Sequence, residues 1–138
     1  MKYWDTSALV FAALANRTLQ GVTRPHALAE FYSFFTGKGP FVELDGVRQR
    51  RPVSPKNTVV MIRRLFPHLK FQEVDAGDTL AALDRAVAEN ILSANIHDYL
   101  HIAAAEKAGC TAIVTTNRKD FKPVTQLRIL NPVEELAA

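Results

Sequence analysis

The stretch KYWDTSALVFAALAN, residues 2–16, decides the fold. Tyr3-Trp4 predicts a short strand that ends at Asp5, and apolar residues at helical spacing predict a helix from Thr6 to Asn16. A strand that passes directly into a helix is typical of the start of an α/β unit. Because functional groups gather at the carboxyl ends of the strands in such sheets, Asp5 is the first candidate site residue.

The same alternation of strand and helix patterns continues along the chain. Caps, turn residues and apolar spacing predict helices at 25–37, 55–66, 78–90 and 98–108, strands at 71–74, 112–115 and 128–130, and a hairpin at 41–51 that turns at Asp45-Gly46. This order predicts a three-layer α/β/α fold with a short central parallel sheet. The length of 138 residues, with no shift in composition, predicts one domain over residues 1–138.

The composition excludes several classes of protein. With 48% hydrophobic and 22% charged residues, the chain can bury a core, which excludes a disordered or low-complexity chain. No stretch approaches the roughly 20 apolar residues of a membrane span, and the first residues lack the apolar run of a signal peptide. The single cysteine, Cys110, cannot form an internal disulfide. We therefore expect a cytoplasmic protein without membrane association.

Some polar residues stand where the pattern favours buried or strand-end positions: Asp5, Glu30, Asp98, Asn117 and Asp120. Carboxylates that converge in one crevice repel each other and raise their own pKa values, and a divalent cation relieves that repulsion. Mg²⁺ takes oxygen ligands and needs only one or two direct carboxylates. Each residue also has a local explanation as a helix cap, a turn residue or a surface acid, and the sequence leaves that alternative open.

Basic residues concentrate in one part of the chain. The excess of 17 Lys and Arg over 14 Asp and Glu is small, but residues 46–72 carry seven Lys and Arg and no acid. Cations hold a nucleic-acid backbone while acids hold metal, so five arginines are candidates for contact with an RNA backbone: Arg48, Arg50, Arg51, Arg63 and Arg64. A solvated surface is the alternative interpretation.

Other chemistries find less support. The sequence has neither a GxGxxG motif nor a phosphate-binding P-loop, so a nucleotide cofactor is not indicated. His97 and His101 have the i, i+4 spacing of a zinc helix, but Asp98 stands where the H-E-x-x-H motif has glutamate. Cys110 has no second cysteine to complete a thiolate site.

Four stretches carry the polar residues in a fixed order: Asp5-Thr6-Ser7-Ala8-Leu9, Thr23-Arg24-Pro25-His26-Ala27-Leu28-Ala29-Glu30, Ile96-His97-Asp98-Tyr99-Leu100-His101-Ile102-Ala103-Ala104-Ala105 and Val114-Thr115-Thr116-Asn117-Arg118-Lys119-Asp120-Phe121. Together they resemble the acidic motifs of the PIN-domain ribonucleases, and the length of the chain is similar to that of the VapC-type toxins of bacterial toxin–antitoxin pairs. The resemblance extends from Asp5 to Phe121. Asn117 departs from it, because many members have aspartate there.

The resemblance implies a Mg²⁺- or Mn²⁺-dependent endoribonuclease that works as a homodimer, is inhibited by a cognate antitoxin and leaves 5′-phosphate and 3′-hydroxyl ends. Asp5, Glu30, Asp98 and Asp120 would be catalytic, and the same four with Asn117 would hold the metal. The hydroxyls of Thr6, Thr115 and Thr116 would position water or phosphate. The residues independently suggest the same mechanism, in which the cation lowers the pKa of a water that attacks the phosphorus in line.

Three other functions remain open from the sequence. The chain can be a PIN-type RNA-processing nuclease without an antitoxin, or a non-catalytic RNA-binding module. It can also be a phospho-acceptor signalling module, although Lys2-Tyr3-Trp4-Asp5 lacks the second acid that such modules place beside the strand end.

Overall fold

The computed structural model describes residues 1–121 and 125–136. Its strands are β1 (Lys2–Trp4), β2 (Gly21–Thr23), β3 (Phe41–Leu44), β4 (Val47–Arg50), β5 (Leu69–Phe71), β6 (Ala112–Val114) and β7 (Arg128–Leu130). Its helices are α1 (Thr6–Leu14), α2 (Pro25–Thr36), α3 (Pro55–Leu65), the 3₁₀ turn η1 (Phe66–His68), α4 (Ala76–Glu89), α5 (Asn95–Lys107), α6 (Arg118–Phe121) and α7 (Pro132–Glu135). Across these residues, every helix is too short or too polar to cross a bilayer.

Five strands form one parallel sheet in the order β5-β2-β1-β6-β7. The first strand of the chain lies at its centre, where Tyr3 is in register with Val22 of β2 and Ile113 of β6. The carboxyl ends of β2, β1 and β6 therefore lie side by side at one edge of the sheet. The prediction of a short parallel sheet is confirmed.

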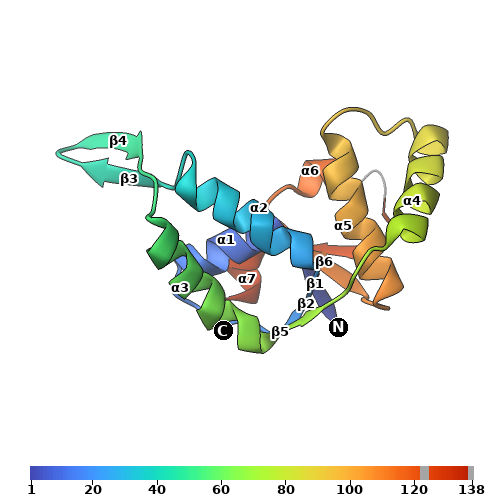
Figure 1. Cartoon of the computed structure of the whole chain (residues 1–138), viewed down its shortest axis with the longest axis horizontal. Helices are drawn as coiled ribbons and strands as arrows, with labels where there is room; N and C mark the ends of the chain where they lie inside the picture. Colours follow the sequence, from blue (N-terminus) through green and yellow to red (C-terminus); the bar gives the residue numbers. More distant parts are fainter. Residues whose placement is uncertain (122–124, 137–138) are drawn as a thin grey trace.

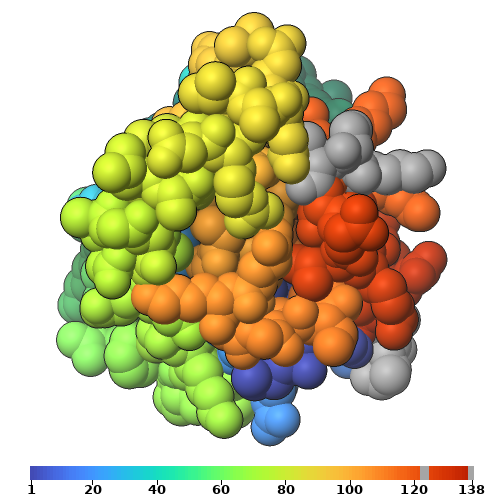
Figure 2. Space-filling model, turned by 90° about the vertical axis from the view of Figure 1, so that its right-hand side faces the viewer, coloured from blue at the N-terminus to red at the C-terminus, as the bar shows by residue number. Residues whose placement is uncertain are grey.

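Helices cover both faces of the sheet (Figure 1). Trp4 of β1 is buried among residues of α1, α2 and α3, which include Phe31, Phe35 and Leu65. The preceding residue, Tyr3, is buried on the opposite face among residues of α4, α5 and α6. Figure 2 looks onto this second face, where α4 and α5 form the outer surface. Because neighbouring residues of a strand point to opposite faces, three-residue strands are enough to join two cores. The predicted three-layer architecture is confirmed.

Several predicted boundaries are wrong by a few residues. The strand expected at 71–74 lies at Leu69–Phe71, because Leu69 is buried in the first core whereas Glu73 is exposed. The helix expected from Asp78 begins at Ala76, since Asp75 and Asp78 form a reciprocal capping box at its start. The strand Gly21–Thr23 was not predicted, because three residues are too few to show a period of two.

The predicted hairpin is present, and it extends from the end of α2 to one end of the long axis of the molecule (Figure 1). Asp45 and Gly46 have φ values of 52° and 77°, so both turn residues adopt the left-handed conformation that a two-residue hairpin requires. The hairpin forms a two-stranded sheet of its own, separate from the central sheet.

Gly21 offers a test of the central strand pairing. A Cβ atom there would lie 2.5 Å from the Lys2 carbonyl oxygen and 2.6 Å from the Trp4 ring, both on β1. We expect Gly21→Ala to lower the free energy of unfolding by about 1–3 kcal/mol, because β1 and β2 must separate. At Gly77 in α4, a Cβ would meet only Asp75 at 3.4 Å, so Gly77→Ala should raise stability by about 0.5–1 kcal/mol. Urea denaturation measures both changes, and equal stability of Gly21→Ala and the wild type would contradict this packing.

Candidate active site

Asp5 lies at the end of β1 and is 2% exposed. Its Oδ1 atom accepts hydrogen bonds from the Ala8 backbone N–H (2.9 Å) and the Ser7 hydroxyl (2.7 Å), so it caps α1. Its Oδ2 atom accepts a hydrogen bond of 2.5 Å from the Thr115 hydroxyl, which follows β6. Burial raises the pKa of Asp5, while these donors oppose that rise. The cap therefore accounts for only part of the environment of Asp5, because a second strand also holds the carboxylate.

Glu30 faces the same edge of the sheet from α2. Its Oε1 atom accepts hydrogen bonds from the Thr6 hydroxyl (2.9 Å) and from Nε2 of His101 on α5 (3.2 Å). Partial burial raises the pKa of Glu30, but the hydrogen bond and charge of His101, together with the Thr6 hydroxyl, outweigh it and lower this pKa to about 2. Glu30 is thus held ionised.

His101 joins the two layers of helices at this edge. It is 2% exposed, and its Nδ1 atom lies 2.6 Å from the Tyr3 hydroxyl. Because a carboxylate can only accept, the hydrogen bond to Glu30 requires the proton on Nε2. Nδ1 accepts from the Tyr3 hydroxyl when the ring is neutral and donates to it when the ring is charged, so the chain Tyr3–His101–Glu30 fixes the position of the carboxylate in either state.

Asp98 lies in the first turn of α5, one turn before His101. No side chain or backbone N–H among residues 1–121 and 125–136 donates a hydrogen bond to its carboxylate. Burial is the largest cause of a rise in its pKa to about 6, and the negative charges of Asp5, Asp120 and Glu30 add to it, against a lowering by His101. Asp98 therefore lies within reach of the charges of the other three acids.

Asn117 and Asp120 lie on the segment that follows β6. The backbone N–H of Asn117 donates to the Thr115 hydroxyl (2.9 Å), while its side chain is exposed. Asp120 lies on α6, is exposed, and contributes to the raised pKa of Asp98. The backbone N–H of Thr116 donates to the Ser7 hydroxyl (3.0 Å), whereas its side chain is exposed. Asp120 therefore acts on the other acids through its charge, and Asn117 and Thr116 contribute backbone contacts.

The chemistry of these donors suits a hard divalent cation. Among the described residues, no three acids, histidines or cysteines surround a single point closely enough to form a ready-made cage. Mg²⁺ does not need one, because it keeps several waters and is held by one or two carboxylates. Asp98, with no hydrogen-bond donor from the described residues and a raised pKa, is the acid whose ionisation a cation would favour most.

Three residues of this network were not among the predicted site residues: Tyr3, Ser7 and His101. Tyr3 and Ser7 lie within two residues of Asp5 in the sequence. However, Tyr3 is equally expected in an apolar strand, and Ser7 is equally expected at the start of a helix. His101 lies three residues after Asp98, on the same helical face, and this spacing was the available signal. His97 is exposed whereas His101 is buried, so the two histidines of the i, i+4 pair do not face a common site.

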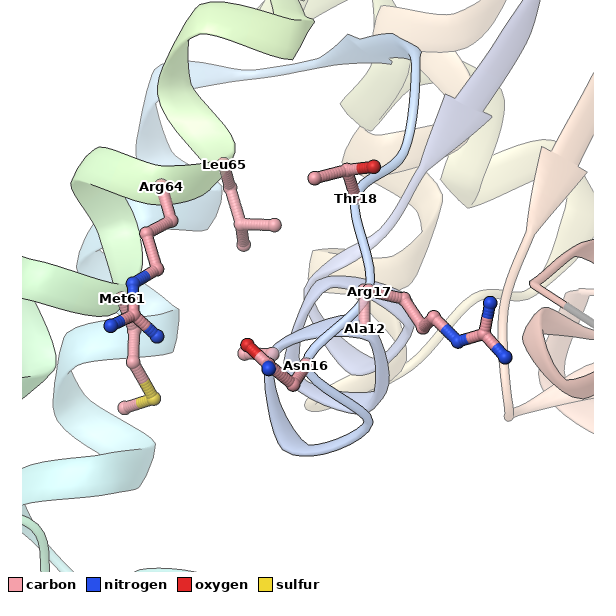
Figure 3. A pocket seen from close by; sticks show the side chains of 8 residues that line it. Ala12, Asn16, Arg17, Thr18, Met61, Arg64 and Leu65 are labelled. Atoms are coloured by element: carbon pink, nitrogen blue, oxygen red, sulfur yellow. The ribbon is translucent and has the colours of Figure 1, made fainter.

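The predicted basic residues lie in two separate places. Arg48 and Arg50 lie on β4 of the hairpin and Arg51 follows it, whereas Arg63 and Arg64 lie in the last turn of α3. Arg64 lines a cavity of about 50 Å³ between α3 and the end of α1, with Met61 and Asn16 (Figure 3). This cavity contains none of the acids. The five arginines therefore do not form one continuous surface strip.

Asp98→Asn tests the shared environment of the acids through stability. The pKa of Asp98 is about 6 in the folded protein, against an ordinary value of 3.8. The folded state therefore holds the proton more tightly than the unfolded state, and the stability of the wild type falls as the pH rises from about 4 to about 6. Asparagine carries no charge, so the stability of the variant does not fall in this pH range. In EDTA, we expect the variant to gain little in Tm below this window and to melt a few degrees higher than the wild type at neutral pH. A control, Asp84→Asn on the exposed face of α4, should show no such trend. An Asp98→Asn variant that is less stable at neutral pH would contradict the repulsion.

His101→Leu tests the buried chain of hydrogen bonds. The change leaves the buried Tyr3 hydroxyl without its partner and removes one of the hydrogen bonds that the Glu30 carboxylate accepts. We therefore expect a loss of about 2 kcal/mol or more in the free energy of unfolding. His97→Leu, on an exposed position of the same helix, should change it by less than about 0.5 kcal/mol. Urea denaturation in EDTA compares the two variants, and similar small effects would mean that His101 does not support this edge.

Comparison with known proteins finds similarity in structure alone. No protein-family model and no curated protein matches the chain. Among solved structures, VapBC2 from Rickettsia felis, bound to a DNA fragment from its promoter, matches with a TM-score of 0.62 at 17% identity, over 95% of this chain and 98% of that one. VapC20 of Mycobacterium tuberculosis, a toxin that cleaves the sarcin–ricin loop, matches at 0.62 and 12% identity, over 90% and 95%. VapBC-1 from nontypeable Haemophilus influenzae matches at 0.62 and 15% identity, over 96% and 99%.

These matches extend over nearly the whole of each chain. At 12–17% identity, they establish the fold and nothing finer. The chain has the PIN-like α/β fold of these VapC toxin structures, as its four acidic motifs predict.

Proposed function

We propose that the chain is a Mg²⁺- or Mn²⁺-dependent endoribonuclease and the toxin of a toxin–antitoxin pair. The observation that carries the proposal is the gathering of Asp5, Glu30, Asp98 and Asp120 at the carboxyl edge of the sheet, where burial and the charges of the other three acids raise the pKa of Asp98 to about 6. The fold shared with VapC toxins, one of which cleaves the sarcin–ricin loop, supports the same activity.

Each residue has a distinct part in the proposed reaction. Asp5 is held on both oxygens by Ser7, Ala8 and Thr115, so its carboxylate keeps a fixed orientation. Glu30 stays ionised under the control of His101 and Thr6. Asp98 and Asp120 are the acids without such partners among the described residues and are free to orient a ligand or its waters.

A divalent cation bound by these carboxylates would neutralise their repulsion and lower the pKa of a water molecule, which supplies the nucleophile for phosphodiester hydrolysis. The carboxylate of Glu30 is held by Thr6 and His101 and can accept a hydrogen bond from that water and orient it. The Thr115 hydroxyl donates to Asp5, so its role is to position that carboxylate rather than to contact phosphate. Asn117 can offer an amide oxygen as a neutral ligand.

The toxin assignment rests on the VapBC neighbours and on surfaces beside the acids. An apolar groove lies next to Thr6, Ser7 and Thr116 and is lined by Val10, Phe11, Leu14 and Phe34. An antitoxin segment in this groove could extend an arginine or lysine to the carboxylates and take the place of the cation. Along the outer surface of α4 (Figure 2), Leu80, Leu83 and Val87 are exposed, which supports the proposed homodimer.

RNA cleavage tests the proposed function directly. Purified protein should cut RNA from a panel of transfer, ribosomal and messenger RNA in the presence of Mg²⁺ or Mn²⁺, and EDTA should stop it. Asp5→Asn and Asp98→Asn should each lower the rate by about 100-fold or more, because each removes a charge on which cation binding depends. Asp84→Asn, which removes an exposed acid far from the edge, should cleave like the wild type.

The same assay can reject the proposal. Cleavage that survives EDTA and both substitutions would show that the acids do not hold a catalytic cation. Mapping the 5′ ends of the fragments identifies the RNA that is cut. Co-expression with the product of an adjacent short reading frame tests the toxin assignment separately from the nuclease activity.

A further inference from the structure

The hairpin β3–β4 has two chemically different faces. Its register pairs Phe41 with Arg50 and Glu43 with Arg48, so these four side chains share one face. Val42, Leu44, Val47 and Gln49 occupy the other face. The other six strand residues, all but Val42 and Gln49, are exposed, so packing on the body of the protein does not explain them.

Two guanidinium groups lie on the ring of Phe41. The Cζ atoms of Arg48 and Arg50 are 4.3 Å and 4.2 Å from the centre of the ring, and Phe41 is still 49% exposed. Neither arginine forms an ion pair within the described part of the chain, although Glu43 lies opposite Arg48. The face thus presents two guanidinium groups that are held in place by stacking on an aromatic ring rather than by carboxylates.

The base of the hairpin is fixed to the helix that carries Glu30. The backbone N–H of Gly39 donates to the Phe34 carbonyl (2.9 Å), and that of Val53 donates to the Phe35 carbonyl (2.7 Å). Gly39 has a φ of +74°, and a Cβ atom there would lie 2.0 Å from the Arg51 carbonyl oxygen, so the strands can converge only around a glycine. Arg50 also donates from Nη1 to the Gly39 carbonyl (3.1 Å).

We propose that this face, Phe41 with Arg48 and Arg50, binds a single-stranded segment of RNA next to the cleavage site. The proposal rests on the proposed ribonuclease function and names the class of substrate. Guanidinium groups bind phosphates, and a guanidinium plane stacked on an aromatic ring offers its outer side to a base that is not already stacked in a duplex. From Glu30 the rest of α2 extends about 9 Å and the hairpin strands about 14 Å more, a distance of a few nucleotides.

A second copy of this chain is a less suitable occupant for the same face. The face carries two arginines and one acid, Glu43, so its net charge is positive and two copies of it would repel each other. The apolar face of the hairpin, with Leu44 and Val47 at its tip, points away from this surface and is not part of the proposal.

Binding assays with matched variants test the proposal. Fluorescence anisotropy in EDTA measures the affinity for a labelled single-stranded RNA of about 12 nucleotides and for the same sequence as a duplex. We expect Arg48→Gln with Arg50→Gln to weaken single-strand binding by about 10-fold or more and to reduce the slope of log affinity against log salt by about 1.4. Phe41→Ala should weaken single-strand binding about 10-fold with the slope unchanged, and should have little effect on the duplex.

The control removes the same charge at the opposite edge of the sheet. Lys70→Gln with Arg128→Gln alters two exposed cations at the amino ends of β5 and β7 and should bind like the wild type. One outcome is that the wild type cleaves RNA and the hairpin variants bind and cleave RNA as well as this control does. In that case the hairpin proposal is wrong and the proposed function stands. If those variants instead change only the elution volume on size exclusion, the hairpin is a protein contact. A wild type that neither binds nor cleaves RNA would overturn both proposals.

Discussion

Electrostatic repulsion among carboxylates at the end of β1 is the constraint on which the rest of the site depends. A parallel sheet places the ends of β2, β1 and β6 side by side, and each is followed by a polar residue or by a helix that carries one. Asp5 is almost fully buried there, and the pKa of Asp98 rises to about 6. Such an arrangement costs stability in the free protein, and it is tolerated where a cation or a cationic partner offsets the charge.

Hydrogen bonds within the protein hold this edge of the sheet together without the cation. Ser7, Thr115 and the start of α1 supply donors to Asp5, and the chain Tyr3–His101–Glu30 connects the two helical layers across the sheet. These hydrogen bonds leave Asp98 and Asp120 as the two acids of the site without a donor from the described residues. The division is physically sensible, because fixed carboxylates define the position of a ligand, while a free one can respond to it.

The sequence could predict the architecture because its signals are local. A strand that ends in Asp5, a Pro-Gly-bounded helix at α2 and the Asp45-Gly46 turn each specify one element, and the alternation specifies the parallel sheet. It could not predict β2, which is too short to show a period, or the role of His101, which depends on Tyr3 and Glu30 approaching from other elements. Likewise, the division of the five arginines between the hairpin and α3 is a property of the three-dimensional arrangement that spacing along the chain does not encode.

Anomalous diffraction from crystals soaked in Mn²⁺ tests most directly whether the acids share a cation. The account predicts an anomalous peak beside the acids at the carboxyl edge of the sheet, with carboxylate oxygens of Asp5 or Asp98 at about 2.0–2.2 Å and the remaining positions filled by water. The same peak should disappear from crystals of the Asp98→Asn variant. A fully occupied Mn²⁺ elsewhere on the molecule, with this edge empty at saturating metal, would contradict the account.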